Sequence, residues 1–150
     1  MAQPPSSNSA SDLDSRLAKL GQTLGARESA HSADLRAARE QLDSLRERIA
    51  SALDGFHRAA ERAGAPHLRI DLGEARVDEK HLRAVEFDLT RGRHKAIVIA
   101  KSRGEITLVG PFRTGKAEGP CQSFPFASQA SITSALAAFL EAFLEEAASP

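Results

Sequence analysis

The spacing of apolar residues changes from that of a helix to that of a strand at Gly64-Ala65-Pro66. Before this point apolar residues recur every three or four positions, as on one face of a helix, and after it they alternate, as in a strand. Glycine suits the end of a helix and proline cannot continue one. The sequence therefore predicts a helical segment at 11–63 and a small α+β domain at 67–147. Residues 1–10 and 148–150 are expected to be tails, and the first of them to be disordered.

Two runs of apolar residues in the helical segment have the heptad spacing of coiled coils. The first run consists of Leu13, Leu17, Leu20 and Leu24, and the second of Leu35, Ala38, Leu42, Leu45, Ile49, Ala52 and Phe56. The second run begins four residues beyond the register of the first, which is a stutter. Either one helix runs through the whole segment, or Gly25 separates two helices.

A continuous helix over this segment would be roughly 75–80 Å long, which exceeds the diameter of a small domain. A narrow heptad seam on such a rod requires a partner helix, so the sequence predicts a dimer or higher oligomer. The expected oligomerisation seam is the second run, with Leu35, Leu42, Leu45, Ile49 and Phe56 as its contacts. The flanking arginines and acids leave parallel and antiparallel pairing open. A helical hairpin at Gly25 that buries its own seam is the alternative.

The residues after His67 have the pattern of an antiparallel meander of about four strands. The turns Arg91-Gly92-Arg93 and Ser102-Arg103-Gly104 have hairpin length. The expected strands lie at 68–72, 85–89, 96–100 and 106–109.

A loop with three prolines is expected at 110–126, followed by an amphipathic helix at 128–147. The apolar stripe of this helix would cover one face of the sheet. The fold class is therefore α+β, with a long N-terminal coiled-coil-like helix, a four-stranded meander and a C-terminal helix packed on the sheet. This order of elements resembles in outline that of the nucleoid-associated YbaB/EbfC proteins.

The chain carries 20 basic and 20 acidic residues and no net charge, but the charges are unevenly distributed. Residues 67–116 hold an excess of basic side chains, and residues 117–150 hold four glutamates and no basic residue. Clustered basic side chains bind phosphates, so an anion or a nucleic acid is a candidate ligand of the basic part. They also keep sheet edges soluble. The candidate contacts are Arg91, Arg93, Arg103, Arg113 and Lys116.

The segment from Gly110 to Lys116 matches the first part of a nucleotide-binding P-loop. Ala117 stands where a hydroxyl must bind magnesium, and Gly119-Pro120 follows where a helix must begin. The sequence therefore predicts no nucleotide hydrolysis. A looser anion site using Arg113 and Lys116 stays open.

No other residue pattern indicates catalysis, a metal or a cofactor. Cys121 is the single cysteine, the five histidines have no metal-ligand spacing, and no apolar run is long enough to span a membrane. A lone cysteine and the lack of a visible signal peptide favour a cytoplasmic protein. The sequence thus predicts a non-enzymatic, homo-oligomeric interaction or adaptor protein with an unknown protein partner. A DNA-binding protein that uses the basic hairpins is the alternative.

Overall fold

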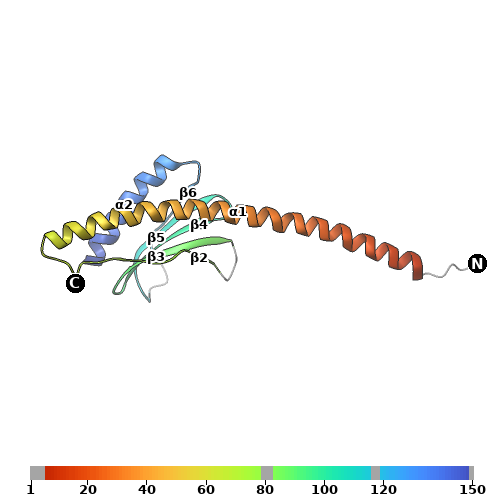
Figure 1. Ribbon diagram of the computed structural model, residues 1–150, viewed down its shortest axis with the longest axis horizontal. Coiled ribbons are helices and arrows are strands. Elements are labelled where there is room, and N and C mark those ends of the chain that lie inside the picture. The colour runs from red at the N-terminus through yellow and green to blue at the C-terminus, as the bar shows by residue number, and fades with distance from the viewer. Residues whose placement is uncertain (1–5, 79–82, 116–118, 149–150) are drawn as a thin grey trace, which may run out of the picture. The chain divides into compact units, whose positions relative to one another are not determined.

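The computed structural model describes residues 6–78, 83–115 and 119–148 of the chain. The predicted α+β class is confirmed: a long helix, an antiparallel sheet and a second helix follow one another (Figure 1). The elements are α1 (Ser6–Arg62), β1 (Asp71–Leu72), β2 (Arg76–Val77), β3 (Ala84–Arg91), β4 (His94–Lys101), β5 (Glu105–Arg113), β6 (Cys121–Pro125) and α2 (Gln129–Ala148).

The first helix is continuous from Ser6 to Arg62, so Gly25 does not separate two helices. It begins inside the range predicted as a tail. Its end has the predicted glycine, since Gly64 adopts a φ of 91°. The Gly64 amide donates to the Glu61 carbonyl at 3.0 Å and the Ala65 amide to the Ala60 carbonyl at 2.9 Å. This bonding is a Schellman motif, which satisfies the last carbonyls of the helix.

The chain divides after Ala33 into two compact units. The first unit contains the N-terminal half of α1. The second unit, from Asp34, contains the rest of α1, the whole sheet and α2.

The sheet has six strands where the sequence predicts four. Its order is β1-β3-β4-β5-β6, with β2 also paired to β3, and every pairing is antiparallel. The added strand β6 lies inside the predicted loop and pairs Cys121 with Val109. The first predicted strand is reduced to β1, beyond which the Gly73 amide donates to the Asp88 carbonyl at 2.8 Å. A side chain at Gly73 would lie 3.3 Å from that carbonyl, so glycine permits the close approach.

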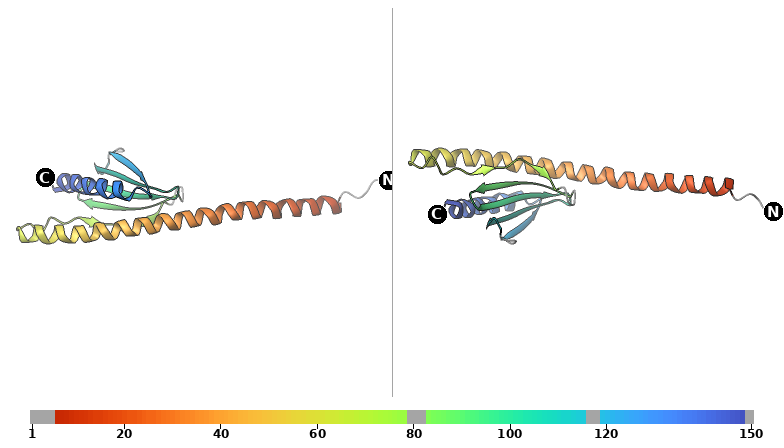
Figure 2. Two further views of the ribbon diagram at one scale, coloured as in Figure 1. Left: turned by 90° about the horizontal axis from the view of Figure 1, so that it is seen from above. Right: turned by 90° about the horizontal axis from the view of Figure 1, so that it is seen from below.

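One hydrophobic core joins the sheet to both helices of the second unit. Alternate residues of β3 and β4 are buried, among them Val85, Phe87 and Val98. As predicted, α2 packs its apolar stripe against the sheet, over β4 and β5 (Figure 2). The buried residues of that stripe are Ile132, Leu136, Phe139, Phe143 and Ala147.

Candidate interaction surfaces

The residues predicted to bind a partner helix are buried inside their own domain. Leu42 and Ile49 are fully buried, and Leu45 is 4% exposed. Leu35 and Phe56 are partly buried and pack against the same core. The prediction assumed that the rest of the chain is too small to cover this seam, and that assumption is wrong because the core of the second unit covers it. These five side chains stabilise the domain and do not form a free surface.

The four leucines nearer the N-terminus are exposed. Leu13 and Leu17 are each 56% exposed, Leu20 is 50% and Leu24 is 48%. Their spacing of four, three and four residues places them on one face of α1. We call this face the leucine seam. Every residue from 9 to 30 is exposed, so the described part of the chain leaves the seam largely uncovered.

Charges of both signs and neutral residues flank the leucine seam. In heptad notation Leu17 and Leu24 take position a, and Leu13 and Leu20 take position d. Arg16 pairs with Asp12 of the same helix at 3.7 Å, and both side chains are largely exposed. A second, identical helix therefore meets no row of like charges beside the leucines. The residues at the flanking positions e and g are Ser9, Asp14, Arg16, Gly21, Thr23 and Glu28.

The arginines predicted to contact an anion or nucleic acid lie at two different ends of the sheet. Arg93 is in the β3–β4 turn, and Arg113 lies beside that turn because it pairs with His94. Arg103 is in the next turn, between β4 and β5. The eight residues of β4 separate the two turns, which corresponds to about 25 Å. The structure therefore does not join these side chains into one patch.

Two of these arginines already have partners within the chain. The Arg91 guanidinium donates to the Ala147 carbonyl at 2.5 Å, at the C-terminus of α2, where the helix dipole favours a cation. Arg103 pairs with Glu105 at 2.9 Å. Arg93 and Arg113 are exposed, and Lys116 lies outside the described residues. Arg103 is itself exposed, but its charge is paired with Glu105, so the exposed arginines without such a pair are Arg93 and Arg113 at one end of the sheet.

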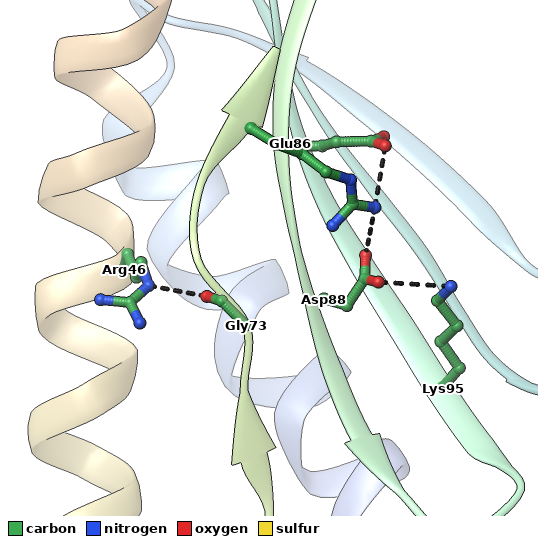
Figure 3. A network of polar contacts seen from close by, with 6 residues as sticks. Arg46, Gly73, Glu86, Asp88 and Lys95 are labelled. Atoms are coloured by element: carbon green, nitrogen blue, oxygen red, sulfur yellow. Dashed lines mark hydrogen bonds and ion pairs between the residues drawn. The ribbon is translucent and has the colours of Figure 1, made fainter. Parts of the chain in front are cut away.

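A network of charges on β2, β3 and β4 went unpredicted (Figure 3). Arg76 donates to Glu86 at 2.9 Å and to Asp88 at 2.8 Å, and Lys95 lies 3.2 Å from Asp88. The hydrogen bond with Asp88 raises the pKa of Arg76 above its ordinary value, with the nearby charges adding to the effect against the cost of burial. Two acids face two bases, so the network is balanced and holds the strands together.

Figure 3 also shows how α1 is fixed to the segment after β1: the Arg46 Nε donates to the Gly73 carbonyl at 2.9 Å. Arg46, which the heptad places at a flank of the second run, is thus bonded within its own domain.

The segment that resembles a P-loop is part of the sheet. Gly110 to Arg113 continue β5, and the Gly110 amide donates to the Pro120 carbonyl at 2.7 Å. The next described element is the strand β6, where a P-loop requires a helix N-terminus. Between this segment and α2 lies an apolar hollow of about 190 Å³, lined by Leu108, Pro111, Ala138 and Phe139 among others, with no titratable side chain.

Cys121 is exposed on β6, and its thiol is free. His57 lies far along the chain on α1, where its Nε2 accepts a hydrogen bond from the Ile70 amide at 2.9 Å. Within residues 6–78, 83–115 and 119–148, no group of three potential metal ligands is found. No described helix combines the length and apolar character needed to cross a membrane.

Comparison of the chain with protein-family models, with curated proteins and with solved structures finds no match.

Proposed function

We propose that the protein is a non-enzymatic interaction protein that assembles by pairing the leucine seams of two copies. The observation that carries this proposal is the half exposure of Leu13, Leu17, Leu20 and Leu24 on one helix face. The α+β domain would then be presented in two copies to a protein partner. A single free cysteine suits a reducing compartment, so we place the assembly in the cytoplasm.

The helix itself supports a pairing partner. An isolated helix in water is marginal unless it is long and rich in strong helix formers. The exposed segment contains Gly21 and Gly25, and each costs about 1 kcal/mol relative to alanine in a helix interior. Since the described part of the chain leaves the four leucines about half exposed, burial of these leucines against another helix is the natural source of stability.

The size of the seam predicts a weak, reversible dimer. Full burial of an exposed leucine contributes about 1.5–3 kcal/mol, so a half-exposed leucine contributes about half of that. The eight leucines of a dimer then contribute roughly 6–12 kcal/mol before the loss of translational and rotational freedom is subtracted. We therefore expect a dissociation constant in the micromolar range or weaker.

A second copy is the occupant that fits best. Two identical seams have the same leucine spacing by construction, so all eight leucines can meet in successive layers. The flanks carry both signs of charge and several neutral residues, which allows self-pairing without repulsion along the leucines.

Sedimentation velocity of the whole chain tests the proposal. We expect the mass of wild type to rise toward twice the 16.0 kDa mass of the chain as its concentration is raised from about 10 μM to about 1 mM, a range that spans the expected dissociation constant. Leu17→Asp with Leu20→Asp should give a monomer, because four carboxylates cannot be buried unpaired in a dimer seam. Ser15→Asp with Gln22→Asp adds the same charge on the opposite helix face and should leave the dimer intact.

Two results would contradict self-pairing: a wild type that stays monomeric throughout this concentration range, or a seam variant that sediments as the wild type does. Far-UV circular dichroism adds an independent measure. Dilution below the dissociation constant should reduce helicity in wild type, since the exposed segment loses its packing.

Nucleic-acid binding is the alternative function, and the split arrangement of the arginines argues against it. We expect little binding of duplex DNA at physiological salt in a mobility-shift assay, because Arg93 and Arg113 alone neutralise few phosphates. Any residual binding at low salt should fall with Arg93→Gln and Arg113→Gln and should be unaffected by Arg103→Gln at the other end of the sheet. Sub-micromolar affinity at physiological salt, lost in the first variant, would restore the DNA-binding hypothesis.

A further inference from the structure

We infer that the outer edge of β6 and the apolar hollow beside it form a docking site for an extended segment of a partner protein. That segment carries an apolar residue and a basic residue two positions away from it. The site deepens the proposed function, on which it rests for the role of the α+β domain in binding a protein partner. It does not depend on the pairing of the leucine seams.

The strand β6 forms one edge of the sheet, and within the described part of the chain its outer side pairs with no other strand (Figure 2). Its pairing with β5 lies between two hydrogen bonds. The Gly110 amide donates to the Pro120 carbonyl at 2.7 Å, and the Phe126 amide donates to the Gly104 carbonyl at 2.9 Å. Bonded pairs alternate along an antiparallel ladder, so the odd-numbered residues of β6 direct their main-chain groups away from β5.

Cys121 and Ser123 therefore present an N–H and a C=O each at this edge. Residues 121–123 carry no charge, the usual means by which an edge strand repels an added strand. The remaining odd-numbered residue, Pro125, has no N–H, and its carbonyl already accepts a hydrogen bond from the Ser128 amide at 3.0 Å. Pairing is thus limited to three residues of β6, which suits a short extended segment.

The hollow lies on the side of β6 that faces α2. The helix α2 packs over β4 and β5, and Gln122 of β6 lines the hollow beyond them. Gln122 pairs with Leu108, which also lines the hollow, so side chains in this row across the sheet point to the same face. A strand added to β6 places the side chain opposite Gln122 on that face. Main-chain bonds at a sheet edge, combined with a pocket for alternate side chains, are a common mode of peptide recognition.

The lining of the hollow selects an apolar side chain. Its walls include Leu108, Pro111, Phe139, Ala138 and Ala142, and the last two are exposed, so the hollow is open to solvent. Its volume is about 190 Å³. An apolar protein cavity of about 150 Å³ holds a benzene molecule, so one aliphatic or aromatic side chain fits here.

A second copy of β6 is a poorer occupant. All four edge groups are satisfied when Cys121 pairs with Ser123 of the partner subunit. Gln122 then faces Gln122 of the partner subunit. This register brings a second amide to an apolar hollow that offers it no bonding partner, which is unfavourable.

The charges beside the hollow favour a basic residue in the docked segment. The only charged side chains in residues 119–148 are Glu141, Glu145 and Glu146. Glu146 is exposed and lies one helical turn beyond Ala142 on the same face of α2. The C-terminus of α2 meets Arg91, at the end of the sheet where β6 begins. Two strand residues span about 7 Å and one helical turn about 5.4 Å, so a basic side chain two positions from the apolar one lies near Glu146.

Nuclear magnetic resonance titration of the whole ¹⁵N-labelled chain tests the site. The probe is the acetylated and amidated peptide Lys-Thr-Leu-Thr-Lys, in which the leucine and both lysines share one face when the peptide is extended. We expect the amide resonances of Cys121 and Ser123 to shift, with a dissociation constant of about 0.1–1 mM. Replacing the leucine of the peptide by alanine should weaken binding about tenfold. The isomer Thr-Lys-Leu-Lys-Thr, with its lysines on the opposite face, should bind about two- to threefold more weakly.

Variants of the chain test the two halves of the site. Cys121→Pro removes an outward N–H and no bond to β5, so it should leave the fold intact and weaken binding about three- to tenfold. Cys121→Ser keeps the N–H and should bind as wild type does. Ala138→Leu fills the hollow and should weaken binding about tenfold. Ala137→Leu, at an exposed position on another side of α2, is its control and should have no effect.

Unchanged Cys121 and Ser123 resonances at about 5 mM peptide would overturn the docking site. Equal binding by wild type and Ala138→Leu would also overturn it. Self-association that persists in Leu17→Asp with Leu20→Asp and is lost in Cys121→Pro would assign the edge to a second copy instead. A wild type that binds the peptide but stays monomeric would contradict only the pairing of the leucine seams. A dimer that does not bind the peptide would contradict only the docking site, so the two failures are distinguishable.

Discussion

Replacing Leu42 with alanine is expected to lower the free energy of unfolding of the α+β domain by about 2–5 kcal/mol, because it empties a fully buried site. The same change at Leu20 should cost the domain less than about 0.5 kcal/mol, since that side chain is half exposed and lies outside the buried core of the domain. Leu20→Ala should instead raise the dissociation constant of the dimer. The two substitutions remove the same atoms from one helix, so they separate the two roles of α1.

Urea unfolding followed by far-UV circular dichroism measures the difference, since the chain has no tryptophan or tyrosine for fluorescence. The protein must be dilute, because a dimer in equilibrium with its monomer adds apparent stability. Equal losses of domain stability in the two variants would show that the leucine seam also packs on the domain. A stable Leu42→Ala variant that no longer dimerises would show that the dimer interface lies in residues 35–56.

The helical period was enough to predict α1 but not what covers each part of it. Both heptad runs give the same signal, an apolar face, and that signal is the same for a core and for an interface. Leu42 and Ile49 are buried by strands that come later in the chain and by α2, and only the three-dimensional arrangement shows this. One feature of the sequence could have distinguished the two runs. Residues 67–147 form a sheet with an apolar face, and such a face needs a helix to cover it, which the second run, nearer in sequence, can supply.

The sheet shows the same division between local and long-range information. Strict alternation over Val85, Phe87 and Leu89 predicts β3, and the structure confirms it. The strand β6 was missed because Cys121, Gln122 and Ser123 have no alternation and prolines flank them. Such residues suit an edge strand, which forms because β5 presents a free edge for pairing.

The division of the arginines between two ends follows from the predicted meander itself. Consecutive hairpins of an antiparallel meander turn at opposite ends of the sheet. Arg93 and Arg103 lie in consecutive hairpins, so the sequence already implies their separation. The partners of Arg91 and Arg103 depend on the position of α2 and on a local side-chain contact, and these require the structure.

Gly110→Ala is expected to cost the domain about 2–4 kcal/mol, the second large effect. Gly110 adopts a φ of 108°, which side chains rarely tolerate. A Cβ there would also lie 3.0 Å from the Lys95 carbonyl oxygen and 3.2 Å from the Ala96 Cα, and both belong to the backbone of β4. Strain and overpacking therefore add, at about 1 kcal/mol and about 1–3 kcal/mol respectively.

Gly104→Ala is the matched control for the packing part of that cost. Gly104 has a φ of 98°, but a Cβ there would meet nothing within 4 Å. We expect Gly104→Ala to cost about 1 kcal/mol, which reflects the backbone conformation alone. The difference between the two variants then measures how closely β5 approaches β4 at Gly110. Thermal unfolding should show it as a midpoint about 8–16 °C below wild type for Gly110→Ala and about 4 °C below for Gly104→Ala. Equal unfolding midpoints for the two variants would mean that β4 moves to accommodate the added methyl group. The cost at Gly110 would then come from the backbone conformation alone.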